Sequence, residues 1–124
     1  MKKLSTKWFY KWSKKNKLCN QDMLKAIKDL ETDLSTSDLG HHLFKVRIKR
    51  TCSGKSKGFR TIIVYKQKDR AIFLYGFGKN DKANIKKSEL KYFKKLSDDL
   101  LALTLNQLKK AIDQKILFDL EETT

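Results

Sequence analysis

Apolar residues near the start of the chain recur at helical spacing. Three aromatic residues follow Thr6 in this way: Trp8, Phe9 and Trp12. Because a threonine before such a group is a favoured N-cap, we predict a short amphipathic helix over residues 7–16 with its tryptophans in the core. A second helix, capped by Asn20, carries apolar residues on one side at Met23, Leu24, Ile27, Leu30 and Leu34. The two helices are predicted to form a helical hairpin.

The period of the hydrophobic pattern changes from 3.6 to 2 after residues 35–40. Three segments rich in β-branched and aromatic residues follow, and they predict strands over approximately 43–50, 59–66 and 70–77. The connections at 51–58 and 66–69 are shorter than the dozen or so residues that a parallel crossover needs. We therefore predict an antiparallel meander.

Helical periodicity returns between Ile85 and Leu103, which predicts a helix that faces the core. Thr104 and Gln107 match a capping box and predict the start of a separate helix. The apolar residues 116–120 are expected to add an edge strand or to dock on a partner. The predicted fold class is α+β: an N-terminal helical hairpin packed on a small twisted antiparallel sheet, followed by C-terminal helices.

The chain has 124 residues, a length that fits one domain over 1–124. Its net charge is +15, from 29 lysines and arginines against 14 acids. The excess is concentrated in residues 1–60, which hold 16 cations and 5 acids, whereas residues 61–124 hold 13 and 9. Such a field favours nucleic acid or an acidic protein as partner.

Other classes of protein are not supported by the sequence. The longest apolar stretch, Ala71 to Phe77, is far short of the roughly 18 residues that a membrane span needs. Lysines interrupt the amino terminus before a signal-peptide core develops, so we expect a mature cytoplasmic protein. Cys19 and Cys52 lie 33 residues apart without a CxxC pattern. We expect free thiols, and neither a metal nor a small-molecule cofactor.

The most basic segment runs from Lys45 to Arg60 and reads KVRIKRTCSGKSKGFR, with seven cations and no acid. Strand alternation places Lys45, Arg47 and Lys49 on one face, opposite the apolar Val46 and its neighbours. Pairing with the next strand would bring Arg60 to the same face. Such a face suits binding of a nucleic-acid backbone. The predicted RNA contacts are Lys49, Arg50, Lys55, Lys57 and Asn80.

The same cations suit metal-free RNA cleavage. That reaction needs a base for the 2′-hydroxyl, cations for the charge that grows on the phosphate, and a proton for the leaving oxygen. A lysine among other cations can serve as the base, since its neighbours disfavour a further positive charge. Composition alone favours binding without chemistry over cleavage.

Two further segments are candidates for parts of a site. The glycines of YGFGKND, residues 75–81, permit close approach of a backbone and place Lys79 and Asn80 at the strand end, although the spacing is not that of a P-loop. His41 and His42 can titrate near neutral pH, but a solvated loop is favoured. Adjacent strand residues point to opposite sides, so the two histidines do not form a metal pair.

Four segments together resemble the RelE/HigB-type toxins of bacterial toxin-antitoxin modules, in particular the HigB-like branch. They are residues 7–12, residues 38–48, GKSKGFRTI at 54–62, and LYGFGKND at 74–81. The resemblance implies a RelE-like fold and ribosome-dependent cleavage of messenger RNA, which stops translation and growth. It also implies a cognate helix-turn-helix antitoxin as partner.

Carried over by position, the resemblance assigns Arg60 to the transition-state charge on the phosphate and Lys45 or Arg47 to base and phosphate contacts. Lys79 would position the substrate. The C-terminal catalytic tyrosine of some relatives has no clear counterpart, because Tyr92 fits packing or base stacking, so the general acid is unassigned. His41 and His42 stand where close relatives favour glycines. Two alternatives stay open on the same fold: a noncatalytic RNA-binding or regulatory protein, and a ParE-like inhibitor of DNA gyrase.

Overall fold

The structure is a computed structural model that describes residues 1–32, 36–51 and 57–121. Its elements, in chain order, are β1 (Lys2–Thr6), α1 (Lys7–Lys15), α2 (Asn20–Glu31), β2 (Thr36–Gly40), β3 (Leu43–Arg50), β4 (Lys57–Lys66), β5 (Arg70–Gly78), α3 (Lys87–Ala102), α4 (Leu105–Asp113) and β6 (Leu117–Asp119). Within these residues the strands form one six-stranded sheet of order β2-β3-β4-β5-β1-β6.

The predicted fold class is wrong in two respects. The sheet is mixed rather than antiparallel, because β1 runs parallel to β5 while the other neighbours are antiparallel. The chain opens with a strand rather than a helical hairpin: α1 packs on β5 and β1, whereas α2 packs on β3. Each helix therefore buries its apolar side against the sheet and not chiefly against the other helix.

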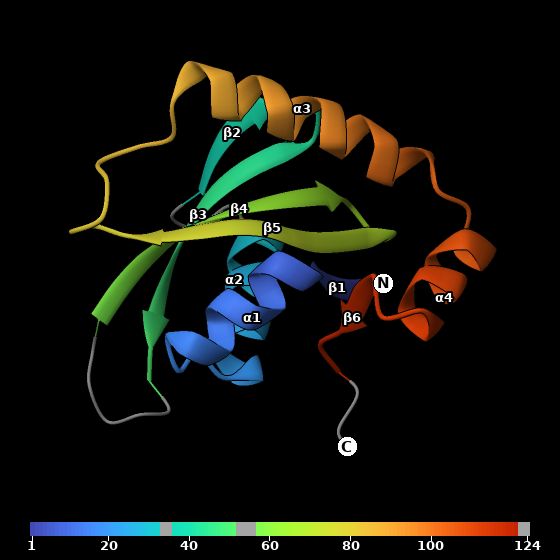
Figure 1. The fold of residues 1–124 in the computed structure, drawn as a ribbon, viewed down its shortest axis with the longest axis horizontal. Helices are drawn as coiled ribbons and strands as arrows, with labels where there is room; N and C mark the ends of the chain where they lie inside the picture. The colour runs from blue at the N-terminus through green and yellow to red at the C-terminus, as the bar shows by residue number, and fades with distance from the viewer. Residues whose placement is uncertain (33–35, 52–56, 122–124) are drawn as a thin grey trace.

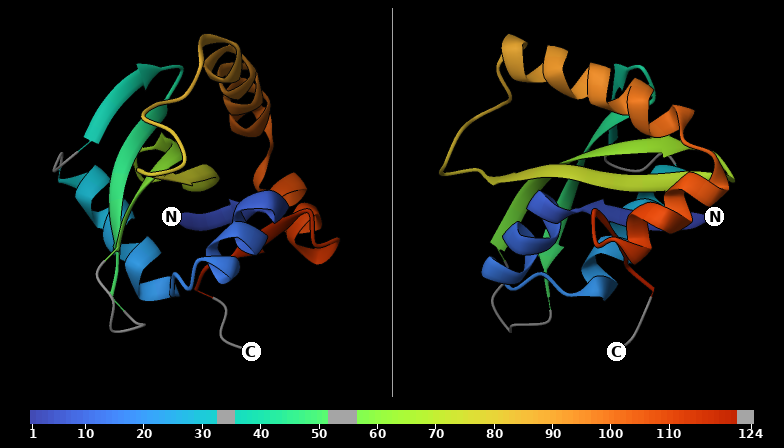
Figure 2. Two further views of the ribbon diagram at one scale, coloured as in Figure 1. Left: turned by 60° about the vertical axis from the view of Figure 1, so that its left-hand side comes forward. Right: turned by 45° about the vertical axis from the view of Figure 1, so that its right-hand side comes forward.

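Two apolar layers cover the two faces of the sheet. Figure 1 shows α1 and α2 on one face and α3 on the other, and both views in Figure 2 keep this arrangement. The first layer packs Phe9 and Ile27 of the helices against Val46 and Phe73 of the sheet. The second layer packs Phe93 of α3 and its neighbours against the opposite face. Because α3 covers only part of that face, the ends of β3 and β4 are left for the site.

Local sequence explains how these elements begin. The hydroxyl of Thr6 accepts a hydrogen bond from the Phe9 amide at 3.2 Å, which confirms the predicted cap of α1. The capping box of α4 is also confirmed, since Thr104 and Gln107 exchange hydrogen bonds of 2.8 and 3.1 Å. In α2 the cap is Cys19, so the prediction of Asn20 was one residue late.

Candidate functional site

The basic row of β3 and Arg60 of β4 share one face of the sheet. Arg47 pairs directly with Arg60, and Lys49 pairs with Gly58 on the same strands. Ile48, between Arg47 and Lys49, and Val46, just before Arg47, are both buried on the opposite face, as period-2 alternation requires. The antiparallel ladder therefore confirms the predicted pairing that brings Arg60 beside the basic row.

Strand β5 extends this face and ends in a tight turn. Phe77 pairs with Arg60 across the β4–β5 ladder. The amide of Gly78 donates to the Asp81 carboxylate at 3.1 Å, and the Asp81 amide donates back to the Gly78 carbonyl at 3.0 Å. This reciprocal pair holds a turn that carries Lys79 and Asn80, because both lie between the two bonded residues.

These elements surround one open cleft, which we call the cationic cleft. Its lining from the sheet and the turn is Arg47, Ile48, Lys49, Gly58, Phe59, Arg60, Lys79 and Asn80. The structure thus brings together five predicted site residues from three strand ends. The wall from α2 adds Asp22 and Asp29, but Asp22 accepts from the Thr51 amide at 3.3 Å and Asp29 pairs with Lys25 at 3.6 Å. Among the described ion pairs, none involves Arg47, Lys49, Arg60 or Lys79.

The remaining predicted contacts do not line the cleft. Lys45 lies on the same face, but it is half-buried and its Nζ donates to Asn84 Oδ1 at 3.4 Å. Arg50 donates to the Asn16 carbonyl at 3.2 Å. Lys57 pairs with Arg50 in the backbone ladder, and its side chain is outside the described part of the structure, as is the whole of Lys55.

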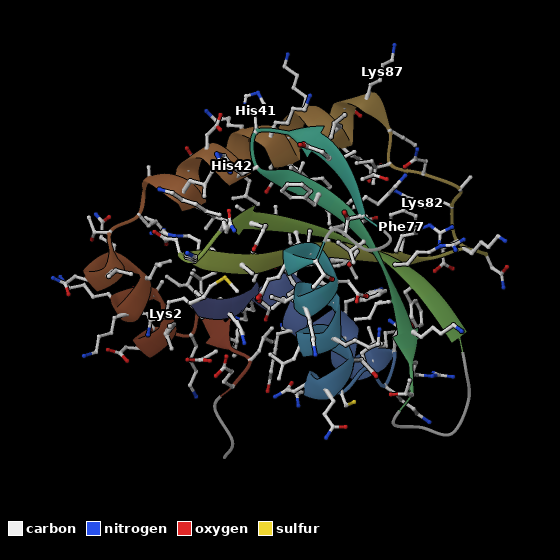
Figure 3. All side chains as sticks on the ribbon, turned by 180° about the vertical axis from the view of Figure 1, so that it is seen from behind. Lys2, His41, His42, Phe77, Lys82 and Lys87 are labelled. Atoms are coloured by element: carbon white, nitrogen blue, oxygen red, sulfur yellow. The ribbon has the colours of Figure 1, made fainter. Side chains whose placement is uncertain are left out.

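An ion pair beside the cleft was missed by the sequence analysis. Lys82 Nζ lies 2.7 Å from a carboxylate oxygen of Glu89, and 5.2 and 5.8 Å from the ring centres of Tyr75 and Phe77. Figure 3 shows Lys82 and Phe77 together at this end of the sheet. The hydrogen bond from Lys82 lowers the pKa of Glu89, and the same bond raises the pKa of Lys82. Lys82 is therefore a stable cation and a poor general base.

The prediction that both tryptophans are core residues is wrong for Trp8. Trp12 packs against Phe9 and stands edge-on to Phe59 at 5.2 Å, whereas Trp8 is 48% exposed and stacks on Tyr75 at 4.7 Å. Tyr75 in turn lies under Lys82. Trp8 and Tyr75 thus connect α1 to the Lys82–Glu89 pair.

Gly76 has a different role from the one predicted. A Cβ at this position would lie 2.4 Å from the Trp12 ring. Glycine is therefore needed here to leave room for the Trp12 indole, and not for the backbone of a ligand. The other candidate segment, His41 and His42, does not line the cationic cleft. His41 and His42 form a two-residue hairpin turn with φ of 55° and 60°, conformations that favour glycine.

This turn is fixed to α3 and not to the cleft. His41 Nδ1 lies 3.0 Å from Asp98 Oδ1, and the Ser97 hydroxyl donates to the His41 carbonyl at 2.6 Å. In Figure 3 both histidines lie beside α3, away from Lys82 and Phe77. Within the described residues no cluster of histidine, cysteine and carboxylate side chains could hold a metal ion.

The expectation of free thiols is wrong for Cys19, which is disulfide-bonded in the structure. Cys52 lies outside the described residues. Tyr92, which was expected to pack or to stack on a base, is 63% exposed and meets Phe93 edge-on at 5.5 Å. It does not line the cationic cleft.

Comparison with known proteins places the chain in a family. A family profile described as "RelE toxin of RelE / RelB toxin-antitoxin system" matches residues 1–120, nearly the whole chain. The chain belongs to the RelE toxin family. No curated protein and no solved structure matches it.

Family membership confirms the resemblance drawn from the sequence and makes the chain a toxin of a toxin-antitoxin system. A RelE-family toxin implies a cognate antitoxin as partner and the ribosome as the place of action. In the parts of the chain that the structure describes, no helix is both long enough and apolar enough to cross a membrane.

Proposed function

We propose that this RelE-family toxin is a ribosome-dependent endoribonuclease that cleaves messenger RNA in the decoding site, with the cationic cleft as its active site. The observation that carries the proposal is the convergence of Arg47, Arg60 and Lys79 on one open cleft. Their charges have no carboxylate partner among the described ion pairs, so they are available to phosphate oxygens.

The geometry supports a division of roles. Arg47 and Arg60 stand on adjacent strands as direct neighbours, so two guanidinium groups can flank one phosphate and stabilise the charge that develops on it. Lys79, on the turn after β5, would hold the flanking nucleotide. Rigid strands fix the first two groups more closely than a loop would, and that precision favours catalysis.

Lys45 is the proposed general base. An arginine is unsuited to this role because its guanidinium stays protonated in proteins, whereas a lysine is among the side chains that serve as general bases. Lys45 lies just outside the lining of the cleft, on the same face of β3 and one alternation from Arg47, where its ammonium group donates to Asn84. The base would remove the 2′-hydroxyl proton so that this oxygen attacks the phosphate, and the bond to the 5′-oxygen breaks. The products would be a 2′,3′-cyclic phosphate and a 5′-hydroxyl, whose proton would come from solvent.

The decisive experiment induces the chain in bacteria without an antitoxin and maps messenger RNA ends. Wild type is expected to arrest growth and to produce new ends in phase with codons. Arg60→Ala is expected to abolish the ends. Lys109→Ala on the exposed side of α4, remote from the cleft, should cut as wild type does.

A second comparison tests the base. If Lys45 removes a proton, Lys45→Arg keeps the charge but loses cleavage as fully as Lys45→Ala does, whereas a mere phosphate contact would survive the change to arginine. Growth arrest without new ends contradicts the proposal. It would favour RNA binding without cleavage, or inhibition of DNA gyrase as in ParE-like proteins.

A further inference from the structure

A second basic surface lies on α3, outside the cationic cleft. Its lysines are Lys87, Lys91, Lys94 and Lys95, which we call the α3 lysine face. With about 100° of rotation per residue, these positions fall within an arc of about 100° on the helix. Lys87 and Lys91 are four residues apart, so their Cα atoms are separated by about 6 Å along the axis. The four side chains therefore form one stripe.

The stripe borders a shallow hollow between α3 and the turn that joins β2 to β3. The hollow is lined by the four lysines together with His41, Leu90 and Asp98. Its one carboxylate, Asp98, is already held by His41 Nδ1 at 3.0 Å. No described ion pair involves the lysines of this face. Figure 3 shows Lys87 extending into solvent beside α3.

The support beneath the face is rigid. Ser97 donates to the His41 carbonyl at 2.6 Å, and Phe93 and Leu100 are buried against the sheet. The face belongs to a different part of the molecule from the cleft, since the two share no lining residue. A row of cations along one side of a helix is suited to a repeating anion.

We propose that the α3 lysine face binds the phosphate backbone of double-stranded RNA and thereby docks the toxin on a ribosomal RNA helix. Lysine is depleted in protein interfaces but is a principal contact to phosphate, and the face offers only Leu90 as an apolar anchor. An acidic protein is therefore the weaker fit. The ribosomal setting rests on the proposed function, whereas binding to duplex RNA does not.

The test measures binding of the full chain to a blunt-ended, fluorescent RNA duplex at salt concentrations between about 50 and about 200 mM. The variant combines Lys87→Gln, Lys91→Gln and Lys95→Gln. Its matched control combines Lys109→Gln, Lys110→Gln and Lys115→Gln, which removes the same charge from exposed positions on and just after α4. Circular dichroism checks that both remain folded.

The α3 variant is expected to bind at least about tenfold more weakly, and the slope of log affinity against log salt should fall by about 2 to 3. The control should stay close to wild type. Asp98→Asn removes the one carboxylate and is expected to strengthen binding. Equal losses in variant and control would overturn the proposal, because net charge alone would then explain binding. Unchanged affinity in the α3 variant would overturn it too.

Two further results separate the possible partners and the two proposals. Arg60→Ala measures the share of the cleft in duplex binding and is expected to weaken it less than the α3 variant does, whereas a loss as large as that of the α3 variant would assign the duplex to the cleft instead. If the α3 variant loses the antitoxin but keeps the duplex, the face binds an acidic protein and the proposal fails. The assay contains no ribosome and needs no cleavage, so its failure leaves the proposed nuclease untouched.

Discussion

Arg47 of β3 and Arg60 of β4 are direct cross-strand partners, so two like charges face each other across adjacent strands. Such opposition destabilises a sheet, by an amount comparable to the 0.2–1 kcal/mol or so that a favourable pair contributes. A pairing that costs stability and also lines a cleft is typical of a binding or catalytic site, where function outweighs packing.

We therefore expect Arg47→Thr to raise the free energy of unfolding by about 0.5 kcal/mol, since threonine suits a strand and removes the repulsion. The same change should reduce cleavage of messenger RNA. Urea denaturation measures the first effect and end mapping the second. Lys49→Thr is the control, because Lys49 faces Gly58 and has no like charge opposite. A stability gain of equal size in both variants would refute the repulsion.

The Lys82–Glu89 pair predicts a dependence of stability on pH. The folded pKa of Glu89 lies below its ordinary value of 4.5, so its contribution is present above that pH and is lost as pH falls through the folded value. The folded pKa of Lys82 lies above 10.5, so its contribution is present below that pH and is lost as pH rises through the folded value. Both contribute fully between these limits.

Glu89→Gln isolates this charge, because glutamine can still accept the bond from the Lys86 amide that Glu89 accepts at 2.8 Å. We expect a loss of about 1 kcal/mol at neutral pH that shrinks toward zero in acid. Urea denaturation across the acid range measures it. Glu121→Gln, in the more exposed pair with Lys3, should change stability little. A loss that stays constant into acid would exclude the ion pair as its cause.

The sequence was most informative where alternation was long and one-sided. In β3 the apolar Val46 and Ile48 fixed which face is buried, and the basic row followed from them. The short strands gave no such signal. β1 has Leu4 as its one large apolar residue, yet it lies between β5 and β6 in the sheet. It gains this place because β5, much later in the chain, runs back alongside it as a parallel partner. Only tertiary pairing places it there.

The same contrast applies to the site. The cations on the strands could be predicted, because pairing of regular strands determines their face. The Lys82–Glu89 pair joins a turn to the start of α3 across seven residues in a lysine-rich stretch, so no pattern selects this partner. Trp8 has the helical spacing of a core residue, but it meets Tyr75 at the sheet edge rather than the interior. Which residues lie at the edge of a sheet depends on the order of the strands and not on local hydrophobic periodicity.

Gly76 is predicted to be intolerant of any side chain. A Cβ would lie 2.4 Å from the Trp12 ring, which is rigid and packed against Phe9. We expect Gly76→Ala to cost about 1 to 3 kcal/mol of unfolding free energy, the usual range for overpacking. Gly58→Ala is the matched control on the neighbouring strand, since a Cβ there would meet nothing within 4 Å. Equal effects in urea denaturation would show that glycine matters through the backbone and not through the indole.

Arg70 ties the end of α3 to the start of β5. Its side chain is almost fully buried, its Nη1 donates to the carbonyls of Leu100 and Leu103 at 2.8 Å each, and its Nε donates to Asp69 at 2.7 Å. The guanidinium thus satisfies carbonyls that the last turn of α3 leaves unpaired. The hydrogen bond that Arg70 Nε donates to the Asp69 carboxylate lowers the pKa of Asp69.

Arg70→Met keeps the length of the side chain but leaves these carbonyls and the carboxylate without their donor. We expect it to lower the free energy of unfolding by about 2 to 4 kcal/mol, since a buried acceptor that loses its partner retains its desolvation cost. The stability of Arg70→Lys should lie between those of wild type and Arg70→Met, because one ammonium group reaches fewer of the three acceptors. Lys66→Met, at the exposed position opposite Arg70 in the ladder, controls for loss of charge. If urea denaturation shows that Lys66→Met lowers the free energy of unfolding as much as Arg70→Met does, the loss comes from charge at this end of the sheet and not from the hydrogen bonds to the end of α3.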